Sequence, residues 1–187
     1  MKITIGHLFY DILNLYGESG NILALKYALE KQGIDVEVKE ISLNDNLYLG
    51  DLDLVYMGAG TETNQILALE YLKKYLPHIS QEVLSGKFFL VTGNAVELFG
   101  THIQDGESKI ETLGIFHYYT ERTKERRVSE CVTIRDGFPM TKPEHGSAPI
   151  RDIPFPAFLW KCRRHSRRNT CITAHQTGFC LQFLPRD

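Results

Sequence analysis

The amino-acid sequence predicts an α/β fold with a mostly parallel sheet that is covered by helices on both faces. Two observations predict this fold. Strand-like and helix-like segments alternate along residues 3–99, and most strand-like segments run into loops rich in glycine, asparagine or threonine. The 187 residues, 43 % apolar and 24 % charged, can bury a core and have a globular composition, which excludes a disordered or fibrous chain.

Residues 3–9, with the sequence Ile-Thr-Ile-Gly-His-Leu-Phe, are expected to form the first strand. A helix is expected from Gly20 to near Gly33, since glycine commonly follows the C-terminus of a helix. The apolar residues of this segment recur at helical spacing, as follows: Ile22, Leu23, Leu25, Ala28 and Leu29.

Two further strands are expected at residues 36–41 and 52–57, where β-branched and other apolar residues gather. The next helix is expected at residues 62–76, because apolar side chains recur there at helical spacing and Pro77 stops the run. The strand at 52–57 ends at a Gly-Ala-Gly sequence, which predicts a tight turn before this helix.

The segments after Pro77 are shorter. They are expected to be a helix at 79–85, a buried strand at 88–91, a helix at 95–99, and two further, antiparallel strands at 115–119 and 126–134. No element is assigned after Ile134, because the pattern there has neither strand nor helix periodicity.

Three loops are expected at one edge of the sheet, where the parallel strands end. They comprise residues 9–21, 58–65 and 92–97. Ligands of open parallel sheets bind beyond the carboxyl ends of the strands. We therefore expect any functional site to be built from these three loops.

The composition changes near residue 140. Residues 1–150 carry a net charge of −7, whereas residues 151–187 carry +5 and hold three of the four cysteines and the single tryptophan. We therefore divide the chain into an α/β domain at residues 1–140 and an atypical basic, cysteine-containing tail at residues 141–187. Real divergence or a reading-frame error in the source sequence would explain such a tail, which is expected to be disordered or frameshifted, and we hypothesise a frame error.

The composition also bears on partners and location. A net charge of −2 predicts no strong attraction to nucleic acid or to anionic lipid. The sequence has no apolar run long enough for a membrane span, and its N-terminus has no signal-peptide pattern. We expect a cytoplasmic protein with free thiols, without a cofactor and without a nucleic-acid or membrane partner.

Each of the three loops has a structural interpretation. Residues 10–21 combine two glycines with two asparagines, as turns and helix caps do. The turn at 58–60 lets backbone N–H groups approach an oxyanion or a phosphate, but no Gly-Lys-Ser/Thr follows it. Residues 90–100 have the strand–turn–helix pattern of a nucleophile elbow, with Gly93 at the bend. From the residues alone, structural turns are the favoured interpretation of the first two loops.

Together, these segments resemble the CobB/CobQ-like class I glutamine amidotransferases. Members of that family open with Tyr-Pro-Asp-Leu-Leu-Asn-Leu-Tyr-Gly-Asp-x-Gly-Asn, which residues 10–21 follow without the proline. Their Gly-Gly-Gly-x-Asp-x-Glu-Gln turn is matched in part by Gly58, Gly60 and Gln65. The opening motif is most similar to that of the small glutaminase subunit of lipid II isoglutaminyl synthase.

The resemblance extends over about residues 3–134. The family has Cys-Gly-Gly-Tyr-Gln-Leu-Leu-Gly at the elbow, where this chain has residues 93–100. It also has a later Gly-Leu-Gly-Ile and a Tyr-Thr, which residues 113–115 and 119–120 match. Aligned back from Gly100, the family's cysteine falls on Gly93 and its glutamine on Glu97.

The resemblance implies a three-layer, flavodoxin-like class I glutamine amidotransferase fold with glutamine as the family substrate. Such enzymes hydrolyse glutamine through a cysteine thiolate that a histidine activates, and a partner synthetase uses the ammonia. A Mur-ligase-like synthetase subunit or a cobyrinate-amidating enzyme is the implied partner. Gly93 has no sulfur, and the later histidines do not align with the catalytic one: His145, His165 and His175.

The resemblance also implies binding residues. The candidates for holding the substrate or its oxyanion are Gly58, Gly60, Gln65, Asn94 and Arg127, the last with Arg126 as its neighbouring alternative. We expect a catalytically silent member of the family. An active glutaminase subunit and an inactive truncated or frameshifted product remain the alternatives.

The tail contains residue types that bind zinc, and it contains clustered arginines. The spacing of its cysteines and histidines matches no common zinc finger. The arginines at 163–168 lack the interleaved aromatic residues of a nucleic-acid module. We therefore assign no metal ligand and no nucleic-acid site.

Overall fold

The structure is a computed structural model that describes the side chains of residues 1–122 and the backbone of several later segments. These segments are 127–135, 138–146, 150–151, 170–175 and 178–183. None of the helices in this described part is long and apolar enough to cross a membrane.

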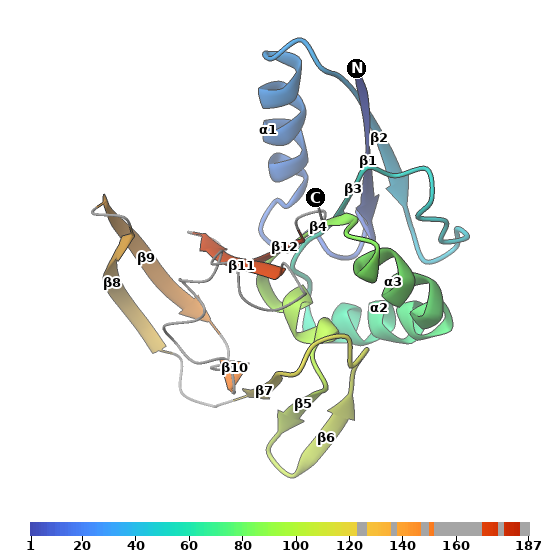
Figure 1. The fold of residues 1–187 in the computed structure, drawn as a ribbon. Helices are drawn as coiled ribbons and strands as arrows, with labels where there is room; N and C mark the ends of the chain where they lie inside the picture. The colour runs from blue at the N-terminus through green and yellow to red at the C-terminus, as the bar shows by residue number, and fades with distance from the viewer. Residues whose placement is uncertain (123–126, 136–137, 147–149, 152–169, 176–177, 184–187) are drawn as a thin grey trace.

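A four-stranded parallel sheet forms the centre of the first part of the chain (Figure 1). Its strands run in the order β2-β1-β3-β4, which is the order of the first four strands of a flavodoxin-like sheet. The strands are β1 (Lys2–Leu8), β2 (Asp35–Ile41), β3 (Leu54–Met57) and β4 (Phe88–Val91). The predicted α/β fold with a mostly parallel sheet is confirmed.

Helices cover both faces of this sheet. The helix α1 (Ser19–Glu30) lies on one face, and α2 (Glu62–Lys74) and α3 (Leu76–Leu84) lie on the other (Figure 1). Neighbouring side chains of a strand point to opposite faces, so Tyr56 joins the cluster under α1 while Val55 joins the larger cluster under α2 and α3. The expected three-layer arrangement is therefore present.

The helix ends follow the sequence signals. Gly33 adopts φ +78°, and its N–H donates to Glu30 O at 3.0 Å just after α1. The Thr61 hydroxyl accepts from the Asn64 N–H at 3.2 Å and caps α2. Pro77 does not end the helical region, since it lies in the first turn of α3, where its missing N–H costs nothing.

After β4 the chain forms the short 3-10 helix η1 (Gly93–Phe99) and a small second sheet. The order of this sheet is β10-β7-β5-β6, in which β5 and β6 are antiparallel and β5 and β7 are parallel. Its strands are β5 (His102–Asp105), β6 (Ser108–Glu111), β7 (Tyr119–Arg122) and β10 (Ile150–Arg151).

Two predictions in this region are wrong. The strand expected at 115–119 begins only at Tyr119, because the preceding backbone bonds to η1: the Leu113 N–H donates to Leu98 O and the Phe116 N–H to Phe99 O. The expected antiparallel pairing holds for β7 with β10 but not for β7 with β5. The β5–β6 hairpin was not predicted.

Two hairpins follow. The strand β8 (Arg127–Arg135) pairs antiparallel with β9 (Phe138–Gly146), which confirms the strand expected at 126–134. The strands β11 (Thr170–His175) and β12 (Gly178–Phe183) also pair antiparallel. Strands therefore follow Ile134, where none was assigned. The division into residues 1–140 and 141–187 stays a prediction.

Candidate functional site

The chain bends sharply where β4 ends. Thr92 is extended, with φ −120° and ψ 157°, and the next residue, Gly93, has φ +59°. This is the left-handed region, which glycine enters without the strain that a side chain would bring. The bend expected at Gly93 is present, and the residue at the bend carries no side chain.

The turn at Gly58–Gly60 packs closely against the first loop. A Cβ atom at Gly58 would lie 2.6 Å from Glu18 Cγ and 2.8 Å from Leu13 O, and one at Gly60 would collide with the Leu13 side chain. Carbon atoms that are not bonded to one another keep about 3.5–4.0 Å apart. Both glycines therefore serve the packing of two loops, and no ligand is needed to explain them.

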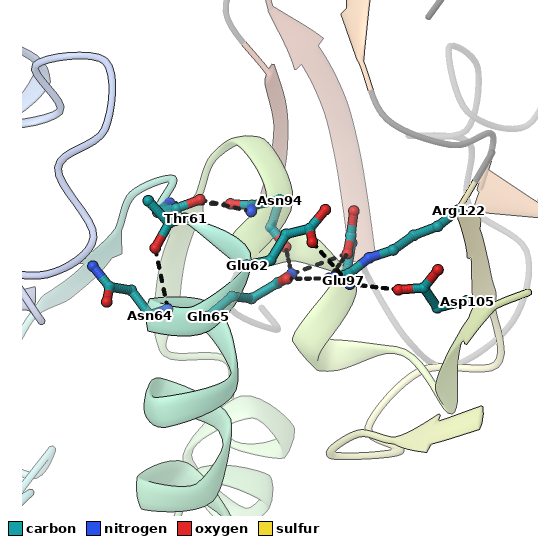
Figure 2. A network of polar contacts seen from close by, with 9 residues as sticks. Thr61, Glu62, Asn64, Gln65, Asn94, Glu97, Asp105 and Arg122 are labelled. Carbon is teal, nitrogen blue, oxygen red and sulfur yellow. Dashed lines mark hydrogen bonds and ion pairs between the residues drawn. The ribbon is translucent and has the colours of Figure 1, made fainter. Parts of the chain in front are cut away.

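Asn94 ties the elbow to this turn (Figure 2). Its side-chain Oδ1 accepts from the Gly60 N–H at 3.1 Å, and its Nδ2 donates to Gly60 O at 2.8 Å. The Gly60 N–H thus already has an acceptor within the protein. Its role as an oxyanion donor stays a prediction, and that role would require the Asn94 amide to move aside.

Gln65 is fully buried and lies at the centre of a polar network beneath the elbow (Figure 2). Its Nε2 donates to Asn94 O at 2.6 Å and to Glu97 Oε2 at 3.0 Å, and its Oε1 accepts from Arg122 at 2.7 Å. All the polar atoms of this side chain are therefore engaged within the protein. A substrate contact by Gln65 stays a prediction.

Arg122 closes this network from β7 and was not singled out in the sequence. Its guanidinium lies 3.1 Å from Asp105 Oδ2 and 3.9 Å from Glu97 Oε2. Burial raises the pKa of Glu97, and the hydrogen bond from Gln65 and the charge of Arg122 oppose that rise. The network thereby joins α2, η1 and β7 around one buried carboxyl group.

A second buried carboxyl group lies on the other side of the elbow. Glu18 is 5 % exposed and accepts hydrogen bonds from Tyr56 Oη at 2.5 Å, Thr92 Oγ1 at 3.0 Å and Asn21 Nδ2 at 3.0 Å. Burial and the nearby Glu18 raise the pKa of Tyr56. Both hydroxyls therefore act as hydrogen-bond donors to a carboxylate.

Glu18 lies in the loop at residues 10–21, which the sequence assigns to turns and a helix cap. Glu18 does stand before the first turn of α1, but its side chain makes no cap bond and instead holds β3 and β4 to the loop. The signal that could have drawn attention to it is an acidic residue between the two glycines of the first loop.

His7 lies on β1 next to this cluster. It is 2 % exposed, and its ring packs edge-on against Tyr56 with 5.3 Å between the centroids. Within the part of the chain that the structure describes, its Nε2 atom has no hydrogen-bond partner. Burial lowers the pKa of His7, so the ring is neutral at neutral pH.

The remaining expected participants lie late in the chain. All four cysteines stand at position 131 or beyond, and the candidate histidines stand at 145 or beyond. Arg127 begins β8, and its side chain lies outside the described residues, as do Arg126, Cys162 and His165. Among the residues whose side chains are described, no group of histidine, cysteine, aspartate or glutamate could hold a metal ion.

The structure thus brings most of the predicted site together. Gly58, Gly60, Gln65, Gly93 and Asn94 come from two separate loops and meet at the carboxyl edge of the parallel sheet. The geometry defines an elbow of the type that carries a nucleophile, and the residue at its bend, Gly93, has no side chain.

A parallel sheet with a strand–turn–helix elbow at its carboxyl edge is the arrangement that the resemblance to class I glutamine amidotransferases implies. Comparison with known protein families agrees, because residues 4–147 match the CobB/CobQ-like glutamine amidotransferase domain. The chain belongs to this family, as its sequence motifs implied.

Two curated relatives are subunits GatD of lipid II isoglutaminyl synthase (glutamine-hydrolyzing). The protein from Staphylococcus aureus strain N315 is 30 % identical over 138 residues, which cover 73 % of this chain and 57 % of the relative. The protein from Streptococcus pneumoniae strain ATCC BAA-255 / R6 is 29 % identical over 142 residues, which cover 75 % of this chain and 55 % of the relative. The matched region spans just over half of each relative.

Proposed function

We propose that this chain is a glutamine amidotransferase-like subunit that does not hydrolyse glutamine. The observation that carries this proposal is Gly93 at the bend of the elbow, at the position where the family's cysteine falls. Glutamine hydrolysis in this class proceeds through a thioester between the glutamyl group and that cysteine. Without a sulfur atom at the bend, the thioester has no place to form.

Among residues 1–122, whose side chains the structure describes, none of those around the elbow supplies a thiol in place of the missing one, which supports this proposal. The Thr92 hydroxyl, one residue earlier, lies 3.0 Å from the Glu18 carboxylate. For a hydroxyl to act as a nucleophile, a base must accept its proton, and the substrate must bind on the side of the strand to which the hydroxyl points. Glu18 instead holds Thr92 and Tyr56 in a buried cluster whose bonds are made within the protein.

The proposed partner is a Mur-ligase-like synthetase subunit. The two relatives are named as subunits of a synthase that hydrolyses glutamine, and both act on lipid II by name. Their likeness to this chain favours that partner over a cobyrinate-amidating enzyme. In this proposal the chain keeps the family's docking surface and has lost the ammonia-producing step.

Glutamate release from glutamine tests this proposal. The full chain is assayed alone and with a candidate Mur-ligase-like synthetase, next to the Streptococcus pneumoniae relative as a positive control. We expect no release above the uncatalysed background in either case, together with co-purification of the chain and the synthetase. Turnover by the chain would establish the active glutaminase alternative instead.

A further inference from the structure

Ala59 lies directly against the bend at Gly93. A Cβ atom added at Gly93 would lie 2.6 Å from Ala59 Cβ and 3.5 Å from Ala59 Cα. Ala59 is 2 % exposed, so its methyl group is enclosed by the protein. The first of these distances is far below ordinary carbon–carbon contact, so both atoms could not be present without displacement of one of the two turns.

Contacts with the first loop, residues 9–21, fix the position of the turn that carries Ala59. The Ala59 carbonyl accepts from the Leu15 N–H at 3.0 Å. The flanking Gly58 and Gly60 lie so close to Leu13 that a Cβ atom on either glycine would collide with it. A retreat of Ala59 from the bend would therefore press this turn into the first loop.

Hydrogen bonds also fix the position of the elbow around Gly93. The Thr92 N–H donates to Met57 O at 3.0 Å, and the Asn94 side chain makes two hydrogen bonds with Gly60. These bonds precede and follow Gly93, so the bend cannot move away from Ala59 without breaking them. The contact between the two positions is consequently fixed by hydrogen bonds on both sides.

From this geometry, and resting on the silent function proposed above, we propose that Ala59 and Gly93 form a coupled pair. The Ala59 methyl group occupies the space that the Cβ atom of a nucleophile at position 93 requires. A side chain at the bend is accommodated only when position 59 is glycine.

Thermal unfolding of four proteins tests the coupling: the natural chain, A59G, G93C and the double variant A59G/G93C. In the natural background, A59G removes a buried methyl group and adds backbone freedom, so the melting temperature falls by about 2–4 °C. G93C alone introduces the collision and lowers the melting temperature by about 5–10 °C. The proposal requires that A59G raises the melting temperature in the G93C background.

The sign of the A59G effect is the decisive result, because a merely structural role of Ala59 would give the same loss in both backgrounds. An equal fall in melting temperature in the two backgrounds would overturn the proposal. The measurement uses no glutamine, so its outcome is independent of the glutamate-release assay. Glutaminase activity of the natural chain would refute the proposed function and leave the coupling result readable.

Gly106 provides a matched control. It has φ +58°, nearly the same as Gly93, and a Cβ atom there would meet nothing within 4 Å. G106C therefore carries the cost of a side chain in the left-handed region without a collision. We expect A59G to lower the melting temperature of G106C, as it does in the natural chain.

A second substitution keeps the test open if G93C does not fold. G93A adds only the Cβ atom, and the pair G93A and A59G/G93A gives the same comparison with a smaller strain. A higher melting temperature in A59G/G93A than in G93A supports the coupling. If glycine at position 59 rescues neither cysteine nor alanine at position 93, the proposal is wrong.

Discussion

Single residues hold the irregular first loop in place. The Tyr56 side chain rises from β3, and its hydroxyl bonds to Glu18 and Asn21 of the loop and its helix while lying 3.2 Å from Thr92 of the elbow. No described residue forms an ion pair with Glu18, and a buried carboxyl group then depends on such donors because it has lost its water. The loop is therefore ordered by polar contacts with strands that come later in the chain.

Tyr56→Phe tests this dependence. The substitution keeps the ring and removes the hydroxyl, so Glu18 loses a donor in a buried site, and the free energy of unfolding is expected to fall by about 1.5–3 kcal/mol. Urea unfolding measures it. Tyr27→Phe, at a residue that is 63 % exposed, is the control and should change the value by less than about 0.5 kcal/mol. Similar losses in both variants would contradict the account.

His7 makes stability depend on pH. Burial lowers its pKa from 6.5, with a smaller opposing effect of Glu18, so near and below this pH the unfolded chain binds more protons at this residue than the folded chain. The free energy of unfolding therefore falls as the pH drops through 6.5 toward the folded-state pKa. His7→Phe, which keeps an aromatic ring against Tyr56, should show a shallower fall between about pH 7.5 and pH 5.

The measurement is urea unfolding at several pH values in this window, with the natural chain and the variant compared at each pH. The comparison isolates His7 because the other titrating groups are common to both proteins. If the free energy of unfolding changes with pH in the same way in both proteins, His7 does not contribute to the pH dependence of stability.

Among the secondary-structure elements, η1 depends most on contacts with other elements for its position. It is a 3-10 helix of seven residues, and five of them are buried. Its Glu97 meets Gln65 from α2 and Arg122 from β7, so three elements far apart in the sequence share one network (Figure 2). The Tyr118 hydroxyl adds a bond to Val96 O at 2.6 Å.

Arg122→Leu tests the network. It removes the cation near Glu97 and the donor to Gln65, and the free energy of unfolding is expected to fall by about 2–4 kcal/mol. Urea unfolding is again the measurement, with Lys109→Ala, which breaks an exposed ion pair with Glu111, as a control expected to cost less than about 1 kcal/mol.

Adding Glu97→Gln to Arg122→Leu should recover part of the loss, since the buried charge left without its cation is then gone. If the double variant is no more stable than Arg122→Leu, the charge of Glu97 is not the cause of the stability lost in Arg122→Leu.

The elements that the sequence predicts well are those with a periodic apolar pattern. The segments at 62–76 and 88–91 were predicted close to their observed bounds, because their apolar residues face a core on one or both sides. Residues 115–118 were misassigned because they are apolar and aromatic but bond to η1. In the β5–β6 hairpin half of the strand residues are exposed and only Ile103 is buried, so there is little apolar pattern to reveal it.

At the scale of the whole molecule, the site arises because parallel strands bring distant loops to one edge. This could be predicted: the loops at 58–65 and 92–97 meet as expected from the fold class alone. The roles of the Glu18 cluster and of Arg122 could not be predicted from the sequence, because they depend on which partners lie opposite these residues in space. The contact between Ala59 and Gly93 likewise requires coordinates.

The tail after residue 140 is the part of the molecule for which sequence reasoning is least tested. The frame-error hypothesis concerns residues that lie mainly outside the described part of the chain. Resequencing the gene around codons 140–155 decides it, since an intact frame there ends the hypothesis.

In the proposed function, the elbow of this glutamine amidotransferase fold carries no nucleophile. The most direct test of this proposal is covalent trapping: the full chain is incubated with a diazoketone analogue of glutamine, which alkylates a thiolate held beside a bound glutamine, and its intact mass is measured. The account predicts an unchanged mass, with or without excess glutamine. A single adduct on one cysteine that glutamine prevents would contradict it.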